Sequence, residues 1–354
     1  MSDYSCDAII INTDEVRFLP LAVTAGGVQA IIESTPRLNR DVLEWLWDRI
    51  TEPVLEELGF HDCPADDESW PRIYWIPTGL LTRLPLHAAG YHGIGGNKTV
   101  MDRVISSYSV SVAALVQAHD HLRRHADRKP ENAVLIGMQG LTGAPKEIQR
   151  VADICQSMKV KMPKPFVSAL LEALKACDVF HFAGHGSSNS QDPSQSALIL
   201  AGQDRLTVSS LLDINLHKRK PFLAFLSACS TGQVRREDLV DEGLHLIAAC
   251  QVAGFRHVIG TLWEVYDSSC VIVAEIVYEH MQIRGMAHES VSEGLHRASR
   301  TLRDSWVAVE HQRIAKRDDT ETDVEIREAM RPVVAADEGG EEPLVWAPYV
   351  HYGI

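Results

Sequence analysis

From residue 133 onwards, short apolar runs alternate along the chain with amphipathic segments, and this alternation constrains the fold more than any other feature of the sequence. The apolar runs are nearly continuous and lie at 133–137, 178–182, 222–226 and 257–261. Such runs are typical of strands that are buried on both faces of a parallel sheet. Between them, residues 146–158 and 239–253 carry apolar side chains at helical spacing. The pattern predicts an α/β fold with a mostly parallel sheet covered by helices on both faces.

The first 130 residues predict a smaller lobe of mixed secondary structure. Apolar runs at 8–12 and 16–23 flank a turn and predict a hairpin. Residues 40–58 have the helical period, and we expect Pro53 either to kink that helix or to divide it. A charged stretch that contains a proline follows at 127–132. Because a chain of 354 residues exceeds the usual size of one domain, we expect an N-terminal accessory α/β lobe at 1–130 and a larger lobe at 131–354.

A segment near the C-terminus interrupts the α/β pattern. Residues 316–342 contain ten acidic and four basic side chains and few large apolar ones. That composition is typical of a solvated or disordered insert. We expect order to return in a final strand within 343–352.

The composition excludes several classes of protein. The formal net charge of −14 argues against a basic surface that binds nucleic acid. The seven cysteines are odd in number and include no CxxC pair, so they indicate reduced thiols rather than a disulfide framework or a zinc ribbon. No apolar run reaches the roughly 18 residues of a membrane span, and the first residues lack the pattern of a signal peptide. We therefore expect a cytoplasmic protein with no membrane span and no nucleic-acid partner.

Reactive side chains follow two of the predicted strands. His185 comes after the strand at 178–182, and Cys229 comes after the strand at 222–226. Because ligand sites of open parallel sheets lie beyond the carboxyl ends of the strands, both side chains would share one rim if the strands are neighbours. A histidine beside a cysteine can raise the thiolate fraction and can protonate a leaving amine. The two residues are therefore candidates for a Cys/His dyad.

Small residues beside the two candidates fit the same chemistry. Gly184 and Gly186 allow a close approach of the backbone to a substrate, and the N–H groups of Gly186 and Cys229 are suited to bind an oxyanion. Taken singly, the cysteine could instead be an inert core thiol and the histidine a surface group. His181 lies four residues before His185, but on a strand that spacing separates the side chains by about 13 Å, and no third ligand is evident. We expect neither a metal nor another cofactor.

Several sequence blocks together resemble a known family. The two that carry the candidate dyad are VFHFAGHG at 179–186 and LSACSTG at 226–232. Further blocks in the expected order are IPTGLLTRLPL at 76–86, AGFRHVIGTLW at 253–263 and WAPYV at 346–350. They closely resemble the CHAT domain, a family of caspase-like cysteine peptidases related to separase. The opening SCDA at 5–8 is similar to the start of fungal members, in which helical TPR repeats precede this domain.

The resemblance implies a fold and a set of site residues. The fold is a caspase-like three-layer sandwich, and the lobe at 131–354 is the catalytic one. His185 is implied as general acid and base, Cys229 as nucleophile, and the amides of Gly186 and Cys229 as the oxyanion hole.

The loop after the strand at 257–261 is expected to border the substrate groove, as in related caspase-like enzymes. Trp263 is expected to form a wall of that groove. Glu264 departs from the small residue or proline that the family pattern favours there. Glu264 and Asp267 would select a basic residue on the N-terminal side of the cut by charge pairing. The alternative for Asp267 is a cap of the helix that follows.

The resemblance also implies a function. We expect a cysteine endopeptidase that cleaves one specific protein substrate, such as a gasdermin-like pore former, in regulated cell death or immune-type defence. Upstream TPR repeats, absent from this sequence, would serve as sensor or docking module. The alternative is a catalytically silent CHAT-fold interaction module. A nucleotide-binding domain would need a glycine-rich phosphate loop, and GMQG at 137–140 is too weak a match.

Overall fold

The computed structural model describes most of the chain. The described residues are 6–34, 38–65, 69–93, 96–124, 128–138, 140–187, 189, 191–214, 216, 219–228, 240–263, 265–318 and 344–354. Cys229 and Glu264 lie outside them, and so does the predicted acidic insert from residue 319 onwards. The first three residues of that insert, 316–318, are the end of a helix.

The chain divides into two compact units. The first comprises Met1–Ser106 and Arg303–Ala347, and the second comprises Ser107–Leu302 and Pro348–Ile354. The second compact unit therefore includes residues 107–130, which belong to the N-terminal lobe expected from the sequence. The functional lobes expected at 1–130 and 131–354 stay a prediction.

The first unit opens with the predicted hairpin. Strands β1 (Cys6–Ile11) and β2 (Val16–Leu21) pair antiparallel. The helices of this part are α1 (Ala25–Ser34), α2 (Arg40–Leu46) and α3 (Glu52–Glu57). In place of one helix at 40–58, a π-helical turn at Trp47–Thr51 separates α2 from α3. Pro53 lies in the first turn of α3, where its missing N–H costs least.

The rest of the first unit contains short strands and turns, the end of helix α10 from Arg303 to Asp318, and a buried ion pair. Strand β3 (Arg72–Trp75) lies beside the start of β4 (Ile105–Tyr108), and Trp75 Nε1 donates to Ser106 Oγ. Short 3-10 turns occupy Gly79–Arg83, Leu86–Ala88 and Val100–Asp102. Arg303 donates through both Nη atoms to the Asp102 carboxylate, at 2.8 and 2.9 Å. This bidentate pair joins segments 201 residues apart in the sequence.

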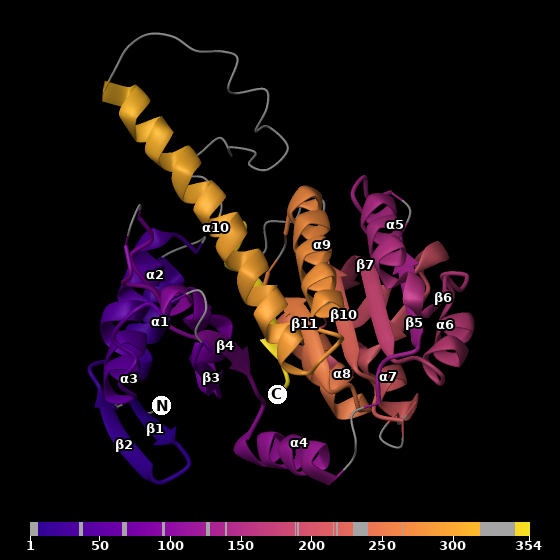
Figure 1. Cartoon of the computed structure of the whole chain (residues 1–354), viewed down its shortest axis with the longest axis horizontal. Helices are drawn as coiled ribbons and strands as arrows, with labels where there is room; N and C mark the ends of the chain where they lie inside the picture. Colours follow the sequence, from indigo (N-terminus) through magenta and orange to yellow (C-terminus); the bar gives the residue numbers. More distant parts are fainter. Residues whose placement is uncertain are drawn as a thin grey trace. The chain divides into compact units, whose positions relative to one another are not determined.

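The second unit is built on the predicted sheet. Its strands run in the order β4-β12-β11-β10-β7-β5-β6 (Figure 1). They are β5 (Asn132–Gly137), β6 (Lys159–Lys161), β7 (Val179–Ser187), β10 (Leu223–Ala228), β11 (His257–Thr261) and β12 (Tyr349–Tyr352). The pairs from β6 to β11 are parallel, and β12 is antiparallel to β11. The prediction of an α/β fold with a mostly parallel sheet is confirmed.

Helices cover both faces of this sheet. They are α5 (Ala144–Ile154) and α9 (Asp267–Ile283), which pack together, and α7 (Val208–Ile214) and α8 (Val240–Ala253), which also pack together (Figure 1). His181 of β7 contacts α5 and α9, whereas a side chain at Gly186 would point to the opposite face and touch Leu246 of α8. The unit therefore has three layers. Its other helices are α4 (Val112–Arg124), α6 (Val167–Leu174) and the first part of α10 (Glu289–Asp318), up to Leu302. No helix in the described part of the chain is long and apolar enough to cross a membrane.

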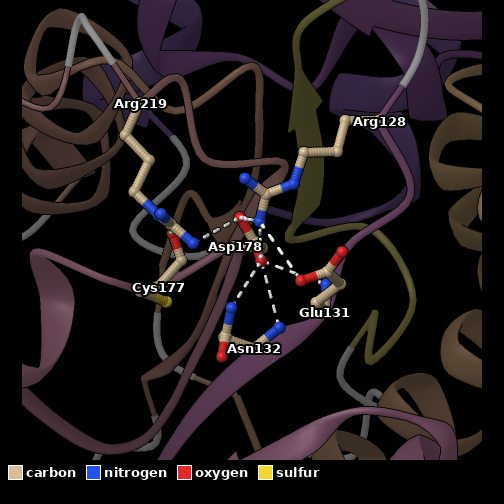
Figure 2. A network of polar contacts seen from close by, with 6 residues as sticks. All are labelled: Arg128, Glu131, Asn132, Cys177, Asp178 and Arg219. Carbon is tan, nitrogen blue, oxygen red and sulfur yellow. Dashed lines mark hydrogen bonds and ion pairs between the residues drawn. The ribbon is translucent and has the colours of Figure 1, made fainter.

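Asp178 organises the amino ends of the central strands. Its carboxylate accepts hydrogen bonds from the backbone N–H groups of Glu131 and Asn132, from Asn132 Nδ2, and from the guanidinium groups of Arg128 and Arg219 (Figure 2). Burial opposes its ionisation, but these donors outweigh that cost and lower the pKa of Asp178 below its ordinary value. The network fixes β5 beside β7 at the edge where both strands begin.

A chain of polar side chains lies at the same edge, on β11 and its neighbours; three histidines and a serine in it are buried, and Arg256 at its start is half-buried. Arg256 Nη1 lies 2.9 Å from His288 Nε2, His288 Nδ1 lies 2.7 Å from His257 Nε2, His257 Nδ1 lies 3.0 Å from His351 Nε2, and His351 Nδ1 lies 2.8 Å from Ser107 Oγ. Arginine can only donate, so His288 accepts at Nε2 and carries its proton on Nδ1. The same rule, applied ring by ring, gives three neutral imidazoles that each donate through Nδ1. The chain of hydrogen bonds therefore runs in one direction, from Arg256 to Ser107.

Candidate active site

The two central strands, β7 and β10, keep one register up to the carboxyl edge of the sheet. In the parallel pair of β7 and β10, Ser227 lies opposite Ala183 and Ala228 lies opposite Gly184. The next residue of β7 is His185, and the next residue in the sequence after β10 is Cys229. Cys229 and the chain up to residue 239 lie outside the described residues, so the contact between the two candidates stays a prediction. What the structure gives is a shared register up to the last residue before each of them.

His185 lies on a part of β7 that extends beyond the parallel sheet. There β7 pairs antiparallel with β8 (Ala197–Ile199), with His185 opposite Ile199, and β8 pairs with β9 (Arg205–Thr207). The ring of His185 is half-buried, and it makes no hydrogen bond to any other described residue. Within that part of the chain, both ring nitrogens remain available for proton transfer.

Of the two glycines that flank His185, only one is required by packing. A Cβ on Gly184 would lie 2.4 Å from the Phe182 ring and 2.6 Å from the Met138 side chain, so packing alone requires glycine there. A Cβ on Gly186 would meet only Leu246, at an ordinary 3.6 Å. Packing therefore does not explain Gly186, and its role as an oxyanion donor stays a prediction. The sequence suggested close approach to a substrate for both glycines and gave no sign of the packing constraint at Gly184.

The loop after β11 reaches the same edge of the sheet. Leu262 is buried and donates its N–H to the Pro348 carbonyl, and Trp263 is half-exposed. This places Trp263 just past the end of a strand that neighbours β10. Its role as a wall of the substrate groove stays a prediction, as does the role of Glu264.

Asp267 connects two loops of this edge. Its Oδ2 accepts hydrogen bonds from Thr142 Oγ1 at 3.0 Å and from the Gly143 N–H at 3.1 Å. Tyr266 is the N-cap residue of α9, and the Asp267 carboxylate reaches instead to the loop that precedes α5. A Cβ on Gly143 would lie 2.9 Å from Asp267, so glycine is needed for this approach. The sequence did not indicate Thr142 or Gly143, because they lie more than 120 residues from their partner.

A buried polar cluster is centred on His181, which lies four residues before His185 on β7. His181 Nε2 and Glu147 Oε1 are 3.0 Å apart, and His181 Nδ1 and the Tyr278 hydroxyl are 3.2 Å apart. The His181 ring also stacks on Phe225 of β10. Burial raises the pKa of Tyr278 well above its ordinary value, so the phenol stays neutral. The described residues contain no group of three metal-ligating side chains, and His181 serves the core between α5, α9 and the sheet.

Three other thiols in the core of the second unit, those of Cys155, Cys177 and Cys250, are unreactive because of their environment. Burial raises the pKa of Cys155 and of Cys250 to about 12, and it also raises the pKa of Cys177. A thiol with such a pKa is almost entirely protonated near neutral pH, and the neutral thiol is a poor nucleophile. None of these three cysteines competes with Cys229 as a candidate nucleophile.

The family model of the CHAT domain matches residues 40–354 of the chain. The chain belongs to the CHAT domain family. Its structure is similar to a chain of the separase–securin complex of Saccharomyces cerevisiae, with 17% identity, a TM-score of 0.43, and coverage of 72% of this chain and 14% of that chain. It is also similar to the Arg-specific cysteine proteinase gingipain R, with 11% identity, a TM-score of 0.45, and coverage of 77% and 71%. No curated protein sequence matches it.

Proposed function

We propose that this CHAT domain protein is a cysteine endopeptidase with Cys229 as nucleophile and His185 as general acid and base. The observation that carries the proposal is the register of β7 and β10, which pairs Gly184 with Ala228 one residue before each candidate. Neighbouring strands lie about 4.8 Å apart, so one more residue in the same register would bring the imidazole and the thiol within reach of each other. Two further observations support the same assignment: the ring of His185 makes no hydrogen bond to any described residue, and burial raises the pKa values of Cys155 and Cys250.

The reaction follows from the chemistry of these groups. The Cys229 thiolate attacks the substrate carbonyl carbon, the C–S bond forms, and the carbonyl oxygen becomes an oxyanion held by the N–H groups of Gly186 and Cys229. His185 donates its proton to the leaving nitrogen as the C–N bond breaks. A water molecule then attacks the acyl-enzyme while His185 accepts a proton from it. The second product leaves as a carboxylate, and the thiolate is restored.

The substrate side of the proposal concerns the loop after β11. We assign Trp263 as a wall of the groove, and Glu264 with Asp267 as the groups that select a basic residue N-terminal to the cut. Asp267 has one carboxylate oxygen engaged by Thr142 and Gly143, which holds it at this edge of the sheet. Library peptides that carry Arg or Lys at that position should be cleaved in preference to others, and indifference to them would remove the assignment.

The physiological setting is part of the proposal. The substrate would be one specific cytoplasmic protein, such as a gasdermin-like pore former, cleaved in regulated cell death or immune-type defence, with upstream TPR repeats as sensor or docking module. Membership of the CHAT domain family supports this setting. Identification of peptides released in cells that express the wild-type chain, but not in cells that express Cys229→Ala, would test it.

The dyad is tested by cleavage of a co-expressed candidate substrate. Cys229→Ala and His185→Ala should each reduce cleavage about 10³-fold, because nucleophilic and general-acid steps are lost. Cys63→Ala is the matched control, since this thiol is exposed and lies in the first unit. Cleavage that persists in both dyad variants contradicts the assignment. A wild-type chain that binds the substrate without cleaving it would instead favour a catalytically silent interaction module.

A further inference from the structure

We propose that Arg205 determines specificity for an acidic side chain in the substrate residues that follow the cut bond. The inference rests on the proposed peptidase function and adds a subsite that lies beyond His185, on the β8–β9 hairpin. It concerns the opposite side of the cut from Glu264 and Asp267.

The register of strands β7, β8 and β9 aligns three residues across the hairpin. His185 of β7 lies opposite Ile199 of β8, and Ile199 lies opposite Arg205 of β9. Directly paired residues of antiparallel strands point to the same face of a sheet. His185, Ile199 and Arg205 therefore form one row across three strands, and the Cα atoms at its ends are about 10 Å apart.

The two faces of the hairpin differ in burial. Leu198 and Leu206 point to the other face and are fully buried. In the row, His185 and Ile199 are half-exposed and Arg205 is exposed. The row that carries the candidate general acid is thus partly open to solvent and has a cation at its end, whereas Ala197 on the same face is buried.

The Arg205 side chain leans back toward β7. Its Nη2 donates to Ser187 Oγ at 2.9 Å, and Ser187 lies two residues beyond His185, on the same face of the strand. In the described part of the chain, no carboxylate forms an ion pair with Arg205. The adjacent Asp204 accepts from the Val167 N–H and from the Arg205 backbone N–H, so its side chain is engaged elsewhere. A guanidinium has five N–H donors, and most of those on Arg205 remain available to a carboxylate.

The chemistry of the reaction decides which part of the substrate meets this surface. His185 must donate its proton to the leaving nitrogen, so it faces the C-terminal side of the cut bond. The proposal places the row from His185 to Arg205 under that side of the cut bond. An extended peptide advances about 3.4 Å per residue, so Arg205 lies within reach of the first three residues after the cut. Arginine matches a carboxylate in both charge and geometry.

The test uses the full chain and a peptide library in which the three positions after the cut vary. Cleavage rates are compared for wild type, Arg205→Ala, Arg205→Lys and Arg205→Glu. Arg297→Ala is the matched control, because Arg297 is an exposed arginine on α10 of the same unit. We expect wild type and the control to prefer Asp or Glu over Asn or Gln about threefold to fivefold at one position, as for an exposed ion pair. Arg205→Ala should lose the preference, Arg205→Lys should keep part of it, and Arg205→Glu should reverse it toward basic residues.

The outcomes separate the inference from the proposed function. If wild type cleaves the library without a preference for acids, or if Arg205→Ala keeps that preference, the inference is wrong while the peptidase assignment stands. If Arg205→Ala slows cleavage of acidic and amide peptides equally and lowers the melting temperature, Arg205 only fastens β9 to Ser187, and the inference is again wrong. If wild type cleaves no peptide, the proposed function fails and the inference fails with it.

Discussion

Strand β7 begins next to Asp178 and ends with the segment that carries His185. The polar groups at its two ends differ in the number of hydrogen-bond partners that they have among the described residues. At the amino end, the Asp178 carboxylate accepts from four residues, and the histidine chain from Arg256 to Ser107 lies at the same edge. At the carboxyl end, among the described residues, the ring of His185 has no hydrogen-bond partner and the side chain of Arg205 has only Ser187.

This difference separates stability from chemistry. A buried polar group contributes to stability when its partners are complete, because an unpaired buried group costs free energy. A catalytic group must keep its donors and acceptors for the substrate, so it contributes little to folding. The amino end is therefore expected to govern unfolding, and the carboxyl end is expected to govern turnover.

The largest effect is expected for His185→Ala, on activity alone. Peptide cleavage should fall about 10³-fold because the leaving nitrogen loses its proton donor. The free energy of unfolding, measured by urea denaturation, should change by no more than about 0.5 kcal/mol, since the half-buried ring has no partner among the described residues. A loss of several kcal/mol would show that His185 is a structural residue and would break the comparison.

The next largest effect is expected for Asp178→Ala, on stability alone. The substitution leaves Arg128 and Arg219 without their carboxylate and leaves two backbone N–H groups unpaired, so the free energy of unfolding should fall by about 3 kcal/mol or more. Asp153→Ala, on the exposed surface of α5, is the control and should change it by less than about 0.5 kcal/mol. The specific activity of the folded fraction should be retained; if it falls with stability, the two ends of β7 are not separable.

Acid should weaken the fold through buried histidines of the first unit. Burial lowers the pKa of His87 to about 4 from the ordinary 6.5, and it lowers the pKa of His92 to about 4 as well. Between pH 6.5 and 4 the unfolded chain binds protons that the folded chain does not bind. The contribution of His87 is therefore complete above pH 6.5 and is lost as the pH falls toward 4, by about 3 kcal/mol in total.

Urea denaturation at several pH values in this range measures that loss. His87→Leu should flatten the dependence in part, with His92 responsible for the remainder. A slope as steep in His87→Leu as in wild type would contradict the assignment to His87.

The smallest effect is expected at Asp267, which lies at the carboxyl end but has partners. Asp267→Ala removes two hydrogen bonds and should lower the free energy of unfolding by about 1 kcal/mol, and Thr142→Val, which removes one, should have a smaller effect. If Asp267 also selects a basic residue, Asp267→Ala should reduce the preference for Arg or Lys in library peptides, while Thr142→Val should not. Equal changes of specificity in both variants would mean that Asp267 acts only by holding the loop.

The sequence was sufficient to predict the main strands and helices of the second unit and the positions of the candidate catalytic residues. Apolar runs and helical periods depend on neighbours within one or two turns of chain, and they predicted β5, β7, β10 and β11 and the helices α5 and α8. The sequence blocks around His185 and Cys229 identified the CHAT domain family, which the family comparison confirms. The helical period at 40–58 is also confirmed, and the chain there is divided just before Pro53 by the turn at Trp47–Thr51.

Only the tertiary structure decided which distant residues meet. Asp267 with Thr142, His257 with His351, and Arg205 with Ser187 are joined across turns, strands and helices, and no local pattern marks one residue as the partner of the other. The same holds for Gly184, which must be glycine because the Phe182 ring and Met138 fill the space beside it. The periodicity of the sequence indicates whether a side chain faces the core. Which distant residues contact each other depends instead on strand order and register, and these are determined only when the whole sheet packs.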